Sequence, residues 1–406
     1  MSPDPYGTRA LRDAVLTAWA ASPARLREDA NAEEDHARGW YRDRVVVELA
    51  QNAADAAVRA REPGDLTLEL RTDGARTLLV ATNTGEPLDA AGVAALASLR
   101  ASAKRDHADA VGRFGVGFAA VRSVADDVAV LTPTGAVHFS LAATRRTLAD
   151  LTATRGDGTG VPDGERAALA DEVARRGAWL PVLRLPFEGP GGLTVPAPTA
   201  GTRVALLLRD AAAVAGVRAQ LDALDDALLL ALPGLTRVTV RTPAGERTLT
   251  DVGDRWWVAR RSGTFGDGVL TGRPVEEQTR TGWQVAWAVP RDGEAPRVVH
   301  APTPTDEPCS VPALLVASFP LDPSRRHVAP GAATDALVAE AGRTWGDLVR
   351  SLHRAGADDG APHPLDLLPA ALPAGDLDAA LCSAVRAAVR DAAVLIPAAG
   401  GPAVAP

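Results

Sequence analysis

The hydrophobic pattern is clearest in residues 45–60, where apolar positions recur with the period of a helix. This run, VVVELAQNAADAAVRA, is rich in alanine and contains neither Gly nor Pro, so the sequence predicts a helix. Glu48, Asn52 and Asp55 are spaced four and then three residues apart, which puts them on one face of it. The neighbouring stripe is apolar and suits packing against a sheet: Leu49, Ala53, Ala56 and Ala57.

A pattern with the period of strands follows. Three leucines alternate with polar residues in the run LTLEL, residues 66–70, as in a strand with one buried face. The turn Asp73-Gly74 leads into a second apolar run that ends at Asn83-Thr84-Gly85, so this segment is predicted to be a hairpin. The exit of its second strand offers polar groups that can read the edge of a ligand.

The segment Gly112 to Phe118, GRFGVGF, is rich in glycine and precedes another apolar run. Glycine lets the backbone wrap around an anion, and the amides of the loop and of a following helix then point at phosphate oxygens. Residues 90–109 before it are alanine-rich and then polar, which favours a mobile cover over a ligand. The loop is neither the G-x-G-x-x-G fingerprint nor a Walker loop, because it lacks Gly-Lys-Ser/Thr.

The polar face of the helix 45–60 suits a hydrated divalent cation and a water molecule that is to be activated, because Glu, Asn and Asp oxygens converge there. An ordinary solvated helix face is the alternative, since acidic and amide side chains recur on helices. The other motifs along the chain decide between these two interpretations.

Composition narrows the class of protein. The chain has 406 residues, 46 % of them apolar, which is enough for two or three domains with proper cores. A net charge of −8 argues against general affinity for nucleic acid. The two cysteines give no disulfide framework or metal spacing, and neither a membrane-spanning run nor a secretion signal is found. We therefore expect a cytoplasmic protein that binds neither membranes nor nucleic acid.

The sequences ELAQNAADA, NTG and GRFGVGF, in this order, resemble the GHKL ATPase superfamily, and most of all the Hsp90 chaperones and their sacsin-like bacterial relatives. Gly201-Thr202, at the start of the apolar run 203–208, is similar to the fourth motif of that superfamily. The resemblance covers residues 1–210. It implies an α+β fold, the GHKL (Bergerat) α/β sandwich with a mixed sheet, and ATP and Mg²⁺ as cofactors.

The resemblance also implies a role for each matching residue. Glu48 would be the general base that polarises the attacking water, and Asn52 would be the protein ligand to Mg²⁺. Asp55 would support these groups, either through water or by orienting the helix face. Thr202 would hydrogen-bond in the adenine pocket. Backbone amides at the phosphates, together with a lysine of the cover segment that reaches the terminal phosphates, complete the set: Gly112, Gly115, Val116, Gly117, Phe118 and Lys104.

One position departs from the family pattern. The family usually carries Asp-x-Gly at the strand exit, where the carboxylate accepts the adenine amino proton, whereas Asn83 precedes Gly85 here. Pro87 also stands where a second glycine is common. An Asn oxygen still accepts from an amino group, and its NH₂ can donate to a ring acceptor. The bond is then neutral rather than charge-assisted, so weaker adenine binding is expected.

The pattern changes after residue 210. Residues 211–232 are rich in Ala and Leu and predict one long helix, which Pro233-Gly234 ends. Several strands follow, and their tryptophans are expected to pack in or against a core rather than to form a binding face: Trp256, Trp257, Trp283 and Trp287. Residues 354–374 are rich in Pro, Gly and Ala, which is typical of a linker.

The strand, turn and helix between residues 313 and 345 resemble the transducer-like second domain of the Hsp90 group, in which a basic residue reaches the terminal phosphate of ATP. Arg325 and Arg326 on the turn are the candidates, and two ordinary surface arginines are the alternative. We expect an ATP-binding domain over 1–210 and an α+β transducer-like domain over 211–353. Residues 354–406 would add a linker, one helix and a flexible tail.

These expectations describe a chaperone-type conformational switch that binds Mg²⁺-ATP and slowly hydrolyses it to ADP and phosphate. Client proteins and a nucleotide-dependent homodimer are the partners that the resemblance implies. Two alternatives stay open. One is an ATP-binding regulatory scaffold that does not hydrolyse, which Asn83 and the short C-terminal portion favour. The other is a GHKL histidine kinase. Two observations argue against it: the sequence has no phosphoacceptor-helix pattern, and the glycine-rich loop has the form G-V-G-F rather than the Gly-Leu-Gly-Leu form that those kinases favour.

Overall fold

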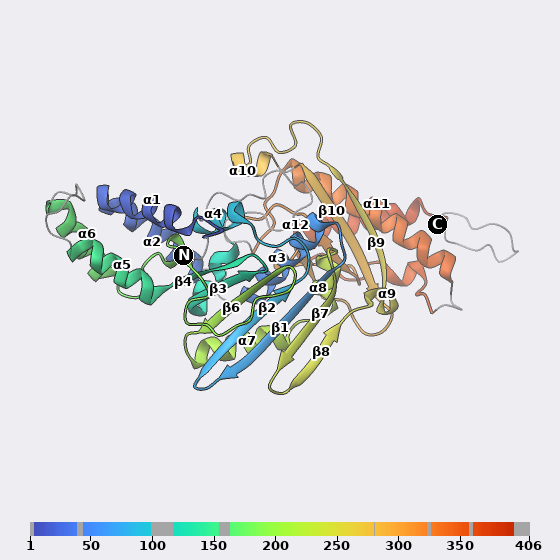
Figure 1. Ribbon diagram of the computed structural model, residues 1–406. Helices are drawn as coiled ribbons and strands as arrows, with labels where there is room; N and C mark the ends of the chain where they lie inside the picture. The colour runs from blue at the N-terminus through green and yellow to red at the C-terminus, as the bar shows by residue number, and fades with distance from the viewer. Residues whose placement is uncertain are drawn as a thin grey trace, which may run out of the picture. The chain divides into compact units, whose positions relative to one another are not determined.

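The chain forms two compact units in the computed structural model (Figure 1). The structure describes residues 4–38, 44–98, 117–153, 163–279, 281–322, 326–356 and 360–393. The first unit comprises Met1–Leu224 and Gly234–Thr248, and the second comprises Asp225–Pro233 and Leu249–Pro406. Each unit has its own mixed sheet and its own helices, so the α+β class is confirmed.

An eight-stranded sheet of order β5-β4-β3-β6-β2-β1-β7-β8 is the centre of the first unit. The pairs from β5 to β1 are antiparallel, whereas β1 and β7 are parallel. The strands are β1 (Gly64–Asp73), β2 (Arg76–Asn83), β3 (Ala125–Thr132), β4 (Gly135–Ser140), β5 (Phe187–Glu188), β6 (Thr202–Leu208), β7 (Leu235–Thr242) and β8 (Gly245–Leu249). β1 and β2 form the hairpin that the alternation of residues 66–70 predicts, with Leu66, Leu68 and Leu70 buried.

The first unit also contains seven described α-helices and two 3₁₀ helices. They are α1 (Thr8–Ala21), α2 (Pro23–Arg38), α3 (Val45–Ala60), α4 (Ala90–Ser98), α5 (Leu141–Ala153), α6 (Asp163–Arg176) and α7 (Ala211–Asp222), with the 3₁₀ helices η2 (Gly117–Ser123) and η3 (Val182–Arg184). The bounds of α3 are those predicted from its composition. Arg61, in the left-handed region at φ 56°, ends α3. At its start, the Val46 amide donates to Gln220 Oε1 of α7 at 3.1 Å.

The second unit packs long helices on a five-stranded sheet of order β12-β11-β13-β10-β9. The strands are β9 (Trp256–Thr264), β10 (Gly282–Pro290), β11 (Val298–His300), β12 (Pro304–Pro308) and β13 (Leu314–Ala317). The helices are α8 (Asp226–Ala231), α9 (Val252–Arg255), α10 (Val275–Gln278), α11 (Ala332–Ala355) and α12 (Asp376–Arg390), with the 3₁₀ helix η5 (Pro364–Leu367). None of the described helices of either unit combines the length and apolar character that a membrane span requires.

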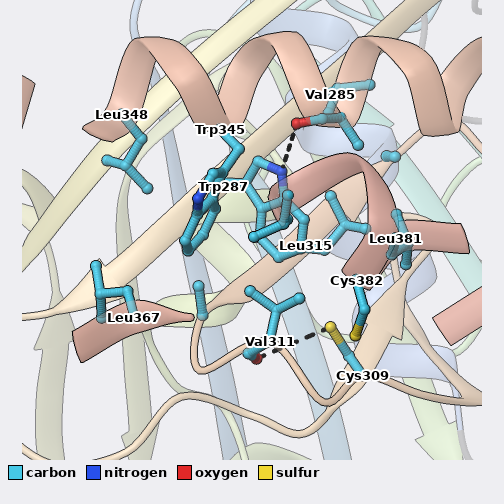
Figure 2. Packing of buried hydrophobic residues seen from close by; sticks show 14 of the residues in the cluster. Val285, Trp287, Cys309, Val311, Leu315, Trp345, Leu348, Leu367, Leu381 and Cys382 are labelled. Carbon is cyan, nitrogen blue, oxygen red and sulfur yellow. Dashed lines mark hydrogen bonds between the residues drawn. The ribbon is translucent and has the colours of Figure 1, made fainter. Parts of the chain in front are cut away.

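Two tryptophans lie at the centre of the core of the second unit (Figure 2). The rings of Trp287 and Trp345 meet edge to face, with centroids 5.1 Å apart, and both side chains are fully buried. Trp287 Nε1 donates to the Ala341 carbonyl at 2.9 Å. Trp257 and Trp283 pack against the same core, so the expectation of core packing holds for these tryptophans.

The structure differs from the expected domains and elements in three ways. β7 and β8 join the first sheet, because β7 pairs with β1 in parallel, so the first unit extends beyond residue 210. The predicted helix over 211–232 is two helices, α7 and α8, because Asp225 caps the second one by accepting from the Ala227 amide. At the C-terminal end, η5 and α12 pack into the core of the second unit rather than forming a separate third part.

Candidate functional site

The polar face of α3 is buried, unlike an ordinary solvated helix face. Asp55 exposes 1 % of its surface, Glu48 9 % and Gln51 7 %, while Asn52 is half-buried. Burying carboxylates is costly unless other groups interact with them, so a face of this composition needs a specific environment. Sequence reasoning identified three of these residues and missed Gln51, which lies three positions after Glu48 on the same face.

The end of the glycine-rich segment lies directly against Glu48. A Cβ atom on Gly117 would lie 1.9 Å from Glu48 Oε2, which is closer than two such atoms can approach. Phe118 next to it is buried, and its ring meets Phe139 edge to face with centroids 6.3 Å apart. The other predicted members of the loop and the cover lie outside the described residues: Lys104, Gly112, Gly115 and Val116.

Asn83 and Thr202 are direct neighbours on adjacent strands. They are partners in the antiparallel register of β2 and β6. Gly201 makes this closeness possible: its φ is +68°, and a Cβ there would lie 1.9 Å from the Asn83 carbonyl oxygen. Two motifs that are more than 100 residues apart in sequence therefore meet at one end of the sheet.

The loop after β2 is fastened to α3. Gly85 has φ +95°, and a Cβ on it would lie 2.7 Å from the backbone carbonyl carbon and oxygen of Ala56. The Glu86 amide donates to the Ala56 carbonyl at 3.1 Å, and Arg59 Nε forms an ion pair with Glu86 Oε2 at 2.7 Å. The NTG motif is thus held against the helix that carries Glu48 and Asn52.

The Asn83 and Thr202 side chains each form a hydrogen bond within the protein. Asn83 Nδ2 donates to the Thr84 carbonyl at 2.6 Å, and Thr202 Oγ1 accepts from the Leu88 amide at 3.0 Å. Among the described residues these bonds leave the Asn83 Oδ1 atom as an acceptor and the Thr202 hydroxyl proton as a donor. The pair can therefore accept from one ligand group and donate to a neighbouring one.

The turn that carries the candidate arginines lies in the second unit. Arg326 forms an ion pair with Asp306, and a bridge between Leu321 and Val328 closes the turn around it. Arg325 lies outside the described residues. Since Arg326 has an acidic partner in its own unit, a role at a phosphate would require it to exchange that partner.

A buried ionic network that sequence reasoning missed adjoins η2. The Arg122 guanidinium, 2 % exposed, contacts Glu33 at 2.9 Å and Asp126 at 2.7 Å, and Asp126 also accepts from Arg209 at 2.9 Å. Burial raises the pKa of Asp126, but the hydrogen bonds from Arg209 and Arg122 outweigh it and hold that pKa below its usual range. The only sequence signal was an arginine within the apolar run FAAVRSVA.

Asn52 and the carboxylates beside it offer oxygen atoms, the type of ligand that Mg²⁺ takes in proteins. Within the described parts of the chain, no group of three or more His, Cys, Asp and Glu side chains could hold a metal ion. Mg²⁺ instead keeps several waters, takes one or two protein oxygens and completes its octahedron with phosphates. The half-buried Asn52 amide between two buried carboxylates fits that requirement.

No protein-family model matches this sequence, and a search among curated proteins also finds no match.

Proposed function

We propose that the first unit binds Mg²⁺-ATP at the end of the sheet where α3, the loop after β2 and Gly117 come together. The observation that carries the proposal is the set of three close approaches at glycine: Gly117 on Glu48, Gly85 on Ala56 and Gly201 on Asn83. Each brings one of the sequence motifs into contact with another. The resemblance to GHKL ATPases orders these motifs in the same way, and this spatial agreement supports a GHKL-type nucleotide site.

Glu48 acts in this proposal as the general base for hydrolysis. Its buried carboxylate can orient a water and take its proton as the water attacks the terminal phosphorus. Asn52 would hold Mg²⁺, which would supply positive charge to neutralise the phosphate oxygens. Asp55, at 1 % exposure, is too enclosed to act as a solvated surface charge and supports the Asn52 side of the helix.

Asn83 and Thr202 read the base. Asn83 Oδ1 accepts from the amino group of adenine, and the Thr202 hydroxyl donates to the neighbouring ring nitrogen. Guanine presents a carbonyl oxygen in place of the amino group, so the contact with Asn83 Oδ1 becomes repulsive. The Thr202 hydroxyl can rotate to accept from the ring N–H of guanine, so the discrimination comes from Asn83. The proposal therefore predicts that the first unit binds ATP in preference to GTP, which competition between the two nucleotides for a fluorescent ATP analogue measures.

Nucleotide binding would make the first unit part of a conformational switch. In the second unit, Arg326 would have to leave Asp306 before it could bind a phosphate group. Client proteins and a nucleotide-dependent homodimer are the partners of such a chaperone-type switch. A scaffold that binds ATP without hydrolysing it is the second candidate. The Asn83 side chain favours it, because a neutral amide cannot form the charge-assisted bond to the adenine amino group that the usual Asp forms.

The test is Mg²⁺-ATP hydrolysis by the intact chain, with binding followed in parallel, for the wild type and Glu48→Ala. Slow hydrolysis that disappears in Glu48→Ala while binding persists supports the ATPase with Glu48 as base. Binding without turnover in the wild type supports the scaffold. If neither protein binds ATP, the proposal is wrong for both candidates.

A further inference from the structure

The 3₁₀ helix η2 connects the glycine-rich segment to the core of the first unit. It runs over seven residues, from Gly117 to Ser123, although 3₁₀ helices longer than three or four residues are uncommon because their hydrogen bonds are poorly aligned. A helix of this kind needs support from its surroundings. Phe118 gives apolar support at its first turn, and Arg122 gives polar support at its last turn.

Arg122 is buried, and both its side chain and its carbonyl group have hydrogen-bond partners. Its Nε donates to Glu33 Oε1 at 2.9 Å, and its Nη1 donates to the Ala125 carbonyl at 2.5 Å and to Asp126 Oδ1 at 2.7 Å. Arg209 Nη2 in turn donates to the Arg122 carbonyl at 2.7 Å. Four contacts therefore fix the end of η2 relative to α2 and β3.

Glu33 joins three separate segments. Besides Arg122, it accepts from the Val182 amide at 3.0 Å and from the Leu183 amide at 2.9 Å, so both carboxylate oxygens are used. Burial is the largest influence on this group and raises its pKa, against the lowering effects of Arg122 and the two amides. Buried ion pairs in general add little net stability, because desolvation offsets their attraction, whereas a pair with this many partners fixes one arrangement of the segments that it joins.

We propose that the Glu33–Arg122 pair positions Gly117 against Glu48, so that Glu33 and Arg122 are positioning residues of the nucleotide site. The pair anchors η2 at Arg122, and the helix connects that anchor over five residues to Gly117. The use of this position for hydrolysis rests on the proposed function, whereas the positioning itself can be measured without nucleotide.

The test compares Glu33→Gln with Glu172→Gln. Glu172 is a matched control, because it is also buried and paired with arginines, Arg27 at 3.2 Å and Arg176 at 2.8 Å, but it joins α2 to α6. Hydrogen exchange followed by mass spectrometry is measured on peptides that cover residues 117–123, without nucleotide. We expect exchange at least tenfold faster in Glu33→Gln and unchanged in Glu172→Gln, because only the former loses the anchor of η2.

Hydrolysis of Mg²⁺-ATP by the same variants gives the second readout, with kcat at least tenfold lower in Glu33→Gln and equal to wild type in Glu172→Gln. Exchange over residues 117–123 that stays at the wild-type rate in a folded Glu33→Gln overturns the proposal. Faster exchange there in a chain whose wild type binds no ATP supports the positioning and refutes the nucleotide site. If Glu33→Gln does not fold, Arg122→Lys, which keeps the charge but has fewer donors, is judged by the same criterion.

Discussion

Close approaches of glycine to side chains and to backbone have different consequences at the residue scale. At Gly117 the atom in the way is Glu48 Oε2, the far end of a flexible side chain, which can move aside at little cost. At Gly201 the atom in the way is a backbone oxygen that belongs to a sheet. The same mutation to alanine therefore tests the chemistry at one position and the stability of the fold at the other.

Gly117→Ala is expected to abolish most of the proposed hydrolysis while the chain stays folded. The added methyl group displaces the Glu48 carboxylate, and a general base contributes about 100-fold or more to the rate. We expect kcat to fall by about that factor and ATP affinity to change little, as measured by steady-state kinetics and calorimetry. Gly216→Ala on α7 is the control, because nothing lies within 4 Å of its added methyl group. An unchanged kcat in Gly117→Ala would contradict a catalytic Glu48.

Gly201→Ala is expected to destabilise the first unit. Its φ of +68° is unfavourable for alanine, and the methyl group would lie 1.9 Å from the Asn83 carbonyl oxygen. Together these effects should lower the free energy of unfolding by about 3 kcal/mol, as measured by urea denaturation. Gly192→Ala is the control, since its φ is ordinary and its surroundings are open. Equal midpoints for the two variants would show that the loop before β6 rearranges freely.

Residue patterns in the sequence indicated part of this site. The spacing of Glu48, Asn52 and Asp55 predicted one polar helix face, Asn83 was predicted from its place at a strand exit, and Thr202 only from the resemblance to GHKL ATPases. Glu33 and Arg122 were not, because a charged residue in a polar run and an arginine in an apolar one look the same whether they are solvated or paired. Only tertiary structure tells which ion pairs are buried.

Local periodicity predicted several elements of the first unit well. The span of α3 and the hairpin of β1 and β2 follow from helical and strand periods over neighbouring residues. The pairing of β1 with β7 could not be predicted in this way, because the two strands lie about 170 residues apart and their parallel register depends on the whole sheet. The contact between α7 and α3 could not be predicted from the sequence either, because these helices are also far apart along the chain.

At the scale of elements, a chain that ends at residue 210 is therefore expected to be defective. It would lack β7, leaving one edge of the ten-residue strand β1 unpaired, and also the Gln220 acceptor at the start of α3. We expect this chain to aggregate more than a chain that ends at residue 248, which keeps β7 and Gln220, as measured by size-exclusion chromatography with light scattering. Monomeric behaviour and equal urea midpoints for both would mean that β7 is dispensable.

The molecule as a whole has two units with separate sheets, so a single unfolding transition is not expected. Tryptophan fluorescence reports mainly on the second unit, which contains five of the eight tryptophans, including the buried pair Trp287 and Trp345. Trp19, which is also fully buried, reports on the first unit. The second unit also contains a buried histidine, His300, on the strand β11. Its protonation links the stability of that unit to pH.

Burial lowers the pKa of His300 from 6.5 to about 4. Between these values the unfolded chain binds a proton that the folded one does not, so stability is full above pH 6.5 and falls as the pH drops towards 4. The shift corresponds to a loss of about 3 kcal/mol for the second unit. Urea unfolding followed by tryptophan fluorescence from pH 7 to 4 measures it. His300→Gln removes the titrating group, so the unfolding free energy of this variant should fall by about 3 kcal/mol less than that of the wild type between pH 7 and 4. If the two curves of unfolding free energy against pH are parallel, His300 binds its proton equally in the folded and unfolded states.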